Sequence, residues 1–452
     1  MGLLKKLAGQ SAIYGISSIL GKSINFLLVP LYTGYLPKEE LGSFTMLYAM
    51  IAFLNVIFTF GMETTYFRFS TGKGLDPKVV FQNAQSLVAG KSLTFALLKL
   101  VNIVLNVGFN ILFIVVAYHI AEGEILQALR PVVSEWYNPD WGVDYILLAN
   151  LLANLLILPI LWKLAGQWKF QLKRTILKPM WHYALPLLFM GLAGVINEVF
   201  SRGLFEYALP EGFYPELTSR EAGGVFGANF KLAILMSLII QAFKYAAEPI
   251  FFQQSENKNN PLIFARVMHW FIIFCTFLMV AVAVNLKLIG ALFFQDEGYA
   301  PALPMVPLLL MGYLLLGIYY NLSIWFKITD QTRYSFYITL VGAIVTLVII
   351  LTLVPVLGYI GGALSTFGSY LVMVLLCYFI GQKYYPIPYQ TKKDISYLLI
   401  AFVLSYAGFL LDTGSLIVNF TLHFSIILLY GGFIFLMEKK ELSSLLKTIF
   451  KK

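Results

Sequence analysis

The stretch that decides the fold is an apolar run that starts near Trp181 and closes on the sequence GLAGVINEVFSR at residues 191–202. Glu198 and Arg202 are four residues apart, so on a helix they share one face, with Asn197 beside it. A carboxylate and a guanidinium at the end of a membrane-length helix are stable when they pair, meet water or face the interior of a bundle. The stretch therefore predicts helices packed around a polar interior. The alternative is a pair at the membrane rim that extends to the headgroups.

The composition is that of a polytopic membrane protein. Of the 452 residues, 59% are hydrophobic and only 12% are charged, whereas a soluble domain carries about 25% charged residues. In a membrane protein the net charge of +9 is explained by Lys and Arg on cytoplasmic loops, so we expect membrane lipids and no nucleic acid as partners. Cys275 and Cys377 lie in apolar runs and the histidines are scattered, so we expect neither a disulfide framework nor a metal site.

Twelve apolar segments approach the length of about 20 residues that a membrane span needs. They are residues 11–34, 43–66, 95–118, 144–162, 180–201, 224–246, 267–290, 302–323, 335–356, 359–380, 395–411 and 416–436. Strand-like alternation is absent. We therefore predict an all-α integral membrane protein with about 12 transmembrane helices and no separate soluble domain.

Loop charge predicts the orientation. Most Lys and Arg fall in the loops on the side of the two termini, and the opposite loops hold only Lys38, Arg130, Arg202, Arg220 and Lys287. Those opposite loops are acidic instead. Because positive loops stay in the cytoplasm, we place both termini there.

Polar side chains recur along the span 95–118. Lys99, Asn102, Asn106 and Asn110 follow one another at spacings of three and four, which puts them on one helical face. Two interpretations remain open. The side chains either hydrogen-bond neighbouring helices or line a water-filled cavity.

Further polar candidates lie in the first, second, fifth and sixth spans and beside them. Together with Lys99, Asn102 and Asn106, we predict that the cavity is lined by Lys22, Asn25, Glu63, Arg68, Asn197, Glu198, Arg202, Gln241, Lys244 and Glu248. Lys22 is the most informative, because a basic side chain halfway along a span reaches the headgroups only with strain. Lys244 and Glu248 either pair at four-residue spacing or form a solvated helix end.

The signs of these charges suggest a ligand. A cavity that contains Lys22, Lys99, Arg202 and Arg68 attracts an anion such as a diphosphate. Glu63, Glu198 and Glu248 then hold a proton or another cation, or balance the charge. The chain has neither the Gly-x-Ser-x-Gly motif nor the Walker A motif. We therefore expect no enzyme, no catalytic residue and no cofactor.

Two segments of the sequence echo each other. Residues 41–69 run from LGSF through an apolar helix to Glu63 and Arg68, and residues 223–252 run from GGVF through an apolar helix to Lys244 and Glu248. Two copies in the same orientation are typical of parallel repeats in transporters.

Several motifs resemble those of bacterial polysaccharide flippases. AIYG at residues 12–15 and LLVPLYT at 27–33 resemble their first helix, and GMET at 61–64 with FRF at 67–69 resembles the end of their second helix. INEV at 196–199 with Arg202, YAAEP at 245–249 and NLSIWFK at 321–327 continue the match. The chain thus resembles the Wzx-like branch of the multidrug/oligosaccharidyl-lipid/polysaccharide exporter superfamily.

The resemblance implies a two-lobed helical transporter with a central cavity. Residues 1–178 would form the first lobe, 179–390 the second, and 391–452 two accessory helices with a basic cytoplasmic tail. Such proteins move undecaprenyl-diphosphate-linked oligosaccharide, including O-antigen units of lipopolysaccharide, to the outer leaflet of the bacterial cytoplasmic membrane by alternating access. The resemblance also implies a Na⁺ or H⁺ gradient as the driving force and other polysaccharide-assembly membrane proteins as partners.

The sequence departs from the family pattern in two places. Residues 67–94 lead directly to what resembles the family's fifth helix, so its third and fourth helices are missing and the first lobe opens to lipid. Position 201 is Ser where close relatives would have Asp. The alternatives are a cation-coupled drug or metabolite antiporter, a non-transporting scaffold, and a glycan polymerase or ligase, whose large catalytic outer loop is lacking here.

Overall fold

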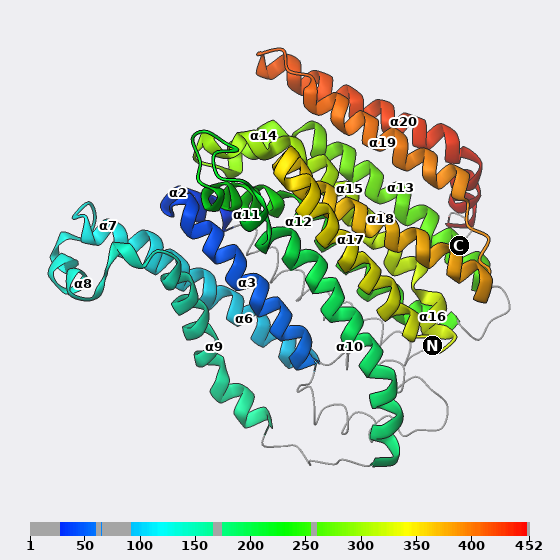
Figure 1. Cartoon of the computed structure of the whole chain (residues 1–452), viewed down its shortest axis with the longest axis horizontal. Coiled ribbons are helices and arrows are strands. Elements are labelled where there is room, and N and C mark those ends of the chain that lie inside the picture. Colours follow the sequence, from blue (N-terminus) through cyan, green and yellow to red (C-terminus); the bar gives the residue numbers. More distant parts are fainter. Residues whose placement is uncertain (1–27, 60–64, 66–91, 166–173, 255–259, 450–452) are drawn as a thin grey trace.

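The computed structural model describes residues 28–59, 65, 92–165, 174–254 and 260–449, and this part of the chain is helical without a strand (Figure 1). Ten of the described helical segments are long and apolar enough to span a membrane. The prediction of an all-α membrane protein is therefore confirmed. The first two predicted spans run into residues outside the described ranges, as does the proposed loss of two family helices within residues 67–94.

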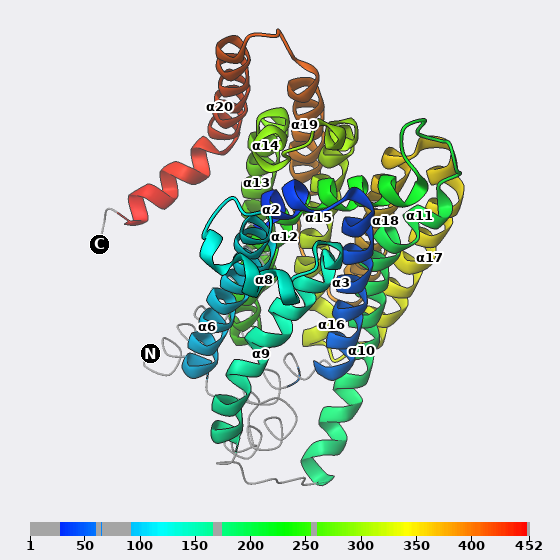
Figure 2. The same ribbon diagram turned by 90° about the vertical axis from the view of Figure 1, so that its left-hand side faces the viewer.

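The first part of the chain forms a small group of helices. Figure 2 shows α3, α6 and α9 running in the same general direction, with α2 across their upper end. The connection between α6 and α9 projects sideways as a helical hairpin (Figure 1). The elements are α2 (Val29–Tyr35), α3 (Lys38–Thr59), α6 (Ser92–Asn110), the π-helix η1 (Ile111–Val116), α7 (Ala117–Ala121), η2 (Gln127–Leu129), α8 (Arg130–Trp136), η3 (Pro139–Trp141) and α9 (Val143–Ala165).

A larger group follows, built around a buried central helix. Within the segment Glu297–Ile328, 89% of the most apolar 18-residue stretch is buried, because α12, α13 and α18 all pack against α15. The elements are α10 (Arg174–Gly203), α11 (Phe205–Ala208), α12 (Ser219–Gln254), α13 (Asn260–Val284), α14 (Leu286–Phe293), η4 (Glu297–Met305), α15 (Val306–Leu322), α16 (Ile324–Ile328), α17 (Arg333–Leu357) and α18 (Tyr359–Tyr384).

Two accessory helices complete the chain. The helices α19 (Thr391–Leu410) and α20 (Leu416–Ile449) lie on one side of the larger group (Figure 1). α19 packs along α13, and α20 contacts both. Only 6% of the apolar segment of α20 is buried, so most of its surface is available to lipid. The predicted boundaries of two lobes and an accessory pair follow this grouping but stay predictions.

The structure corrects the ends of two predicted spans. The span predicted at residues 267–290 is broken at Asn285, where α13 ends and the short α14 begins. The span predicted at 302–323 opens as a 3-10 helix, because Pro301 and Pro304 cannot donate the backbone hydrogen bonds of an α-helix.

Candidate functional site

The helices α3 and α12 cross closely at one end of the bundle. This is the end that loop charge predicts to be outside, and we call it the outer end. A Cβ added at Gly224 of α12 would collide with the carbonyl of Lys38, and one at Gly42 of α3 would lie 3.2 Å from the carbonyl oxygen of Arg220. Small residues let two helix backbones approach in this way. Gly42 and Gly224 belong to the two echoing segments, so the structure brings corresponding parts of the echo together.

An ion-pair cluster lies over this crossing. Lys38 pairs with Asp296 at 2.8 Å, and Arg220 pairs with Glu39 at 2.9 Å and donates to the hydroxyl of Ser43 at 2.6 Å. We call Lys38, Glu39, Ser43, Arg220 and Asp296 the outer cluster. Lys38, Glu39 and Ser43 come from α3, whereas Arg220 and Asp296 come from the larger group. The cluster therefore links the two groups of helices at the outer end.

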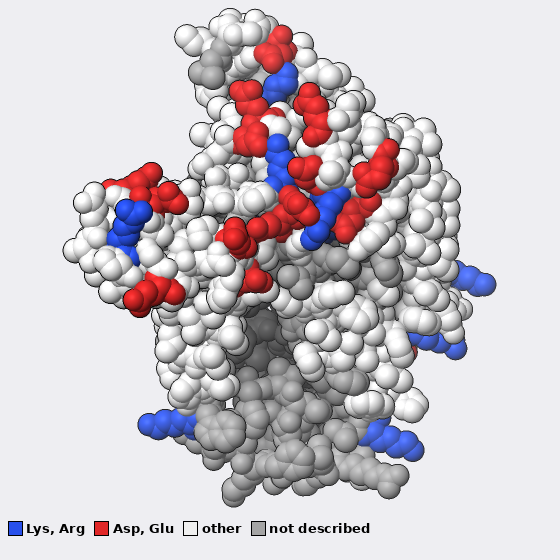
Figure 3. All heavy atoms as spheres, turned by 60° about the vertical axis from the view of Figure 1, so that its left-hand side comes forward, with Lys and Arg blue, Asp and Glu red and all other residues white. Residues whose placement is uncertain are grey.

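Surface charge differs between the two ends of the molecule. In Figure 3, Asp and Glu mixed with Lys and Arg gather over the upper part of the molecule, and Lys and Arg predominate below. The face shown is hollowed beneath the charged region. The hydrogen bonds from Lys38 and from the backbone N–H of Gly298 hold the pKa of Asp296 below its usual range. Asp296 is therefore ionised at neutral pH.

Two basic side chains of the larger group approach each other, and one of them also contacts the smaller group. The guanidinium carbon of Arg202 (α10) lies 5.0 Å from the centre of the Phe230 ring, and the Nζ atom of Lys231 (α12) lies 5.5 Å from the centre of the Tyr32 ring. The two positive charges are close enough to interact. Lys231 is 8% exposed and lies about 18 Å along α12 from its first residue, at 1.5 Å per residue. We call Arg202 and Lys231 the cationic pair.

A ladder of asparagines joins the helices of the smaller group. The hydroxyl of Tyr32 donates to Asn110 at 3.1 Å, and the Asn110 amide donates to the Asn106 side chain at 3.0 Å. Lower on the same face, Asn102 donates to Asn154 of α9 at 3.0 Å. Of the two interpretations of this stripe, hydrogen bonding to neighbouring helices accounts for Asn102 and Asn110. Whether the stripe also contacts substrate stays a prediction.

The other predicted site residues are only partly described. Lys22, Asn25, Glu63 and Arg68 lie outside the described residues. The helix but not the side chain is described for a second set, which comprises Lys99 of α6, Glu198 of α10 and Glu248 of α12. Their roles stay predictions, and so does the pairing of Glu198 with Arg202.

The remaining candidates have separate surroundings. The amide of Asn197 contacts the sulfur of Met373 at 3.5 Å, and its oxygen accepts from Thr346 at 3.3 Å, so it faces α17 and α18. Lys244 lies 4.8 Å from the centre of the Tyr320 ring, and the half-buried Gln241 is nearly one turn before it. The described candidates thus belong to several helix contacts and do not form one cluster.

Sequence reasoning missed two members of the site. Lys231 was not among the predicted site residues, although a basic residue in the middle of the predicted span 224–246 is a signal of the same kind as Lys22. Tyr32 gave no signal, because an aromatic residue near a helix end is normally part of the interfacial belt. Its contact with Lys231 depends on how α2 lies against α12.

These features define a polytopic helical membrane protein in two groups of spans, joined at one end by ion pairs and with a contact between Lys231 and Tyr32 across the groups. No protein-family model matches the sequence, and no curated protein matches it. Solved structures, however, match its fold.

One such structure is the lipid II flippase MurJ in an inward closed conformation. It matches with a TM-score of 0.50 and 13% identity over 95% of this chain and 93% of that chain. Crystal structures of MATE in complex with MaL6 and of MATE in the bent conformation match at 13% identity, with TM-scores of 0.52 and 0.51. They cover 83% and 87% of this chain and 97% and 99% of their own chains. The likeness shows that this chain shares the fold of these structures.

Proposed function

We propose that this chain is a flippase that moves undecaprenyl-diphosphate-linked oligosaccharide across the bacterial cytoplasmic membrane for polysaccharide biosynthesis. The observation that carries the proposal is the cationic pair, Arg202 and Lys231, on two apolar helices of the larger group, where Lys231 also contacts Tyr32 of the smaller group. Ionisable side chains inside a membrane normally mark a substrate or ion pathway. The fold shared with the lipid II flippase MurJ supports the same interpretation.

The diphosphate is the part of this substrate that suits the cationic pair. A guanidinium such as that of Arg202 donates two parallel hydrogen bonds to phosphate oxygens, and an ammonium such as that of Lys231 acts as a compact point charge. Lys231 lies against Tyr32 of the first group and Arg202 against Phe230 of the second. A diphosphate bound to the pair would lie where the larger group meets Tyr32 of the first group, and relative movement of the two groups would carry it.

The outer cluster would act as the gate on the far side. In the present conformation Lys38–Asp296 and Arg220–Glu39 hold α3 against the larger group. Their side chains are partly exposed, and exposed ion pairs contribute about 0–1 kcal/mol each. Such pairs are weak enough to separate in each transport cycle. We propose that substrate leaves through this end when they separate, and that a Na⁺ or H⁺ gradient drives the cycle.

A second candidate is a cation-coupled drug or metabolite antiporter. The observation that favours it is the fold likeness to two MATE structures, whose TM-scores are comparable to that of MurJ. Aromatic rings beside the cationic pair would also suit a flat organic ligand. The two candidates differ in the ligand that the cationic pair would bind. The flippase would bind a lipid-linked diphosphate, and the antiporter would bind an organic drug or metabolite.

The test is a deletion strain, in which we expect the lipid-linked repeat unit to accumulate in the inner leaflet. The wild-type gene should reverse the accumulation, and a gene with both Arg202→Ala and Lys231→Ala should not, at equal membrane levels. Lys287→Ala is the matched control, because Lys287 is exposed and pairs with Asp412 away from the cationic pair. Normal surface polysaccharide in a deletion strain without a second homologue would contradict the proposal. Altered dye efflux alone would favour the antiporter.

A further inference from the structure

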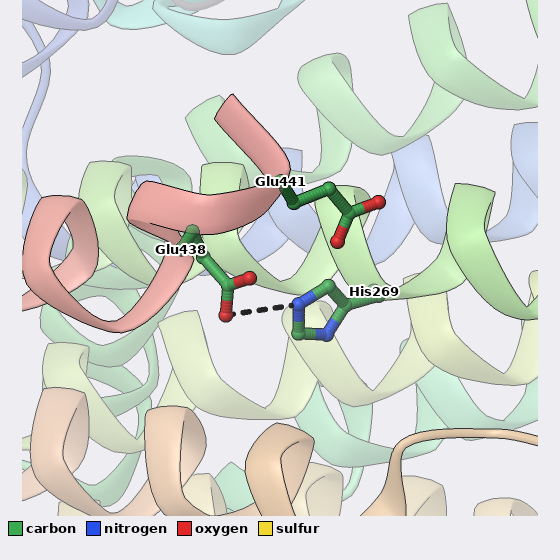
Figure 4. Close-up of side chains that lie close together, drawn as sticks. All are labelled: His269, Glu438 and Glu441. Carbon is green, nitrogen blue, oxygen red and sulfur yellow. Dashed lines mark ion pairs between the residues drawn. The ribbon is translucent and has the colours of Figure 1, made fainter. Parts of the chain in front are cut away.

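A second group of ionisable side chains lies away from the cationic pair, where the accessory helices meet α13. The side chain of His269 of α13 is completely buried, and that of Glu438 of α20 is only 1% exposed. Figure 4 shows Glu438 and Glu441 projecting from α20 toward the imidazole of His269. One ligand-type atom from each of these three residues lies within 4.8 Å of the others. None of these three residues belongs to the outer cluster or to the cationic pair.

The Nδ1 side of His269 is fixed by a carboxylate. Nδ1 lies 2.6 Å from an oxygen of Asp394 at the start of α19, and both side chains are buried. A carboxylate on one ring nitrogen orients the imidazole and makes the other nitrogen a better metal ligand. The neutral tautomer that donates to Asp394 has its lone pair on Nε2.

That Nε2 atom faces Glu438 without a satisfactory hydrogen bond. It lies 3.2 Å from Oε1 of Glu438, yet it makes no hydrogen bond of acceptable geometry. A lone pair that faces a carboxylate oxygen in a buried place is unfavourable unless a positive charge lies between them. The geometry therefore calls for a positive charge at this point, which either a proton on Nε2 or a bound metal ion would supply.

The charge of the whole cluster agrees with this requirement. Asp394, Glu438 and Glu441 supply three carboxylates. Two basic side chains offset part of this negative charge. Lys393 lies 2.8 Å from Glu438, and Arg266 lies 3.2 Å from Glu441. The hydroxyl of Tyr397 donates to Glu438 at 2.7 Å and adds no charge. With a neutral imidazole the cluster therefore has one formal negative charge in excess.

We propose that His269, Glu438 and Glu441 bind a divalent transition-metal ion that fastens α20 to α13. One imidazole nitrogen and two carboxylates are ligands that Zn²⁺ and Mn²⁺ accept, at about 2.0–2.2 Å for Zn²⁺. Glu441 is 25% exposed, so its side chain is able to rotate toward the ion. Glu438 and Glu441 are three residues apart on one face of α20, which lets one helix supply two ligands.

The proposal is tested on the full-length chain in detergent, stripped with EDTA and dialysed. Titration with Zn²⁺, followed by calorimetry and by elemental analysis, should give one ion per chain and a higher Tm. His269→Gln and Glu441→Gln should each abolish stoichiometric binding and the rise in Tm. The matched control is Glu124→Gln, because Glu124 pairs with the histidine His119 on an exposed surface and should change neither.

Three outcomes would overturn the proposal. The first is the absence of stoichiometric Zn²⁺ or Mn²⁺ binding by the wild type. The second is binding that persists in both His269→Gln and Glu441→Gln, which would mean an adventitious ion only. The third is a Tm that depends on pH but not on metal, which would assign the missing positive charge to a proton on His269. If His269→Gln does not fold, the partly exposed Glu441→Gln decides the test.

Discussion

Arg202 and Lys231 carry the same charge but offer a diphosphate different contacts. Arg202 presents a planar fork, and Lys231 is a buried ammonium beside Tyr32. Arg202→Lys would keep the charge and lose the paired hydrogen bonds. A hydrogen bond to a charged group is worth about 1.5–3 kcal/mol, so we expect transport at low substrate to fall by about 10- to 100-fold.

The measurement is flipping of a lipid-linked oligosaccharide in proteoliposomes that contain the purified variant. Lys287→Arg is the control, since this exposed lysine pairs with Asp412 outside the cationic pair. An Arg202→Lys protein that flips as fast as the wild type would show that charge alone suffices at this position.

The charge of Asp296 makes closure of the outer end depend on pH, and closure weakens only on the acidic side. Lys38 and the Gly298 N–H hold the pKa of Asp296 below its usual range in the closed state. Because this pKa is lowered, the ion pair stabilises closure above the ordinary carboxyl pKa of about 3.9. The stabilisation is lost as pH falls through the lowered value. We therefore expect closure to be constant from about pH 6 to pH 8 and to weaken only below about pH 4.

Spin labels on α3 and on the segment before η4 would measure the distance across the gate. Asp296→Asn should lengthen that distance at every pH. A wild-type distance that changed between neutral and mildly alkaline pH would contradict this account.

At the scale of the elements, the crossing of α3 and α12 depends on glycine. A side chain at Gly224 would collide with the backbone of Lys38, which has no means of moving aside unless α3 moves. We expect Gly224→Leu to hold the outer end open, to break the outer cluster and to abolish transport. A cysteine accessibility assay on the α3 face would detect the opening. Gly432→Leu is the control, because nothing lies within 4 Å of a Cβ at that position.

The helix pair α6 and α9 provides a second test at this scale. Asn102 donates to Asn154 across the pair, and such intramembrane hydrogen bonds average about 0.6 kcal/mol. If the asparagine ladder only joins helices, Asn102→Leu should lower stability by about that amount and leave flipping unchanged. The Tm and the flipping rate should be compared in the same preparation. A large loss of flipping at unchanged Tm would instead place Asn102 in the substrate path.

At the scale of the whole molecule, the predicted orientation can be tested by locating the two termini relative to the membrane. Positively charged loops stay in the cytoplasm, so both termini should be cytoplasmic and the outer cluster should face the other side. Fluorescent-protein fusions at both termini should be bright, and phosphatase fusions there should be inactive. An active phosphatase at either terminus would reverse the gate and the direction of transport proposed here.

The sequence determined the class of the molecule and much of its element list. Apolar length and low charge were sufficient for an all-helical membrane protein, because a spanning chain must satisfy its backbone hydrogen bonds within each segment. The breaks at Asn285 and around Pro304 were missed, because hydropathy does not register a short interruption within an apolar run. Arg202 was identified because a charge at the end of an apolar run stands out without any knowledge of its neighbours.

Tertiary structure alone decided which side chains meet. Lys231 contacts Tyr32 across 199 positions of the chain. His269 of α13 contacts Asp394 of α19 and Glu438 of α20. Asn197, which the sequence placed beside the face of Glu198 and Arg202, packs against α17 and α18. Spacing within one helix fixes only which residues share a face. Which partner that face meets depends on how the helices cross, and no local pattern encodes that crossing.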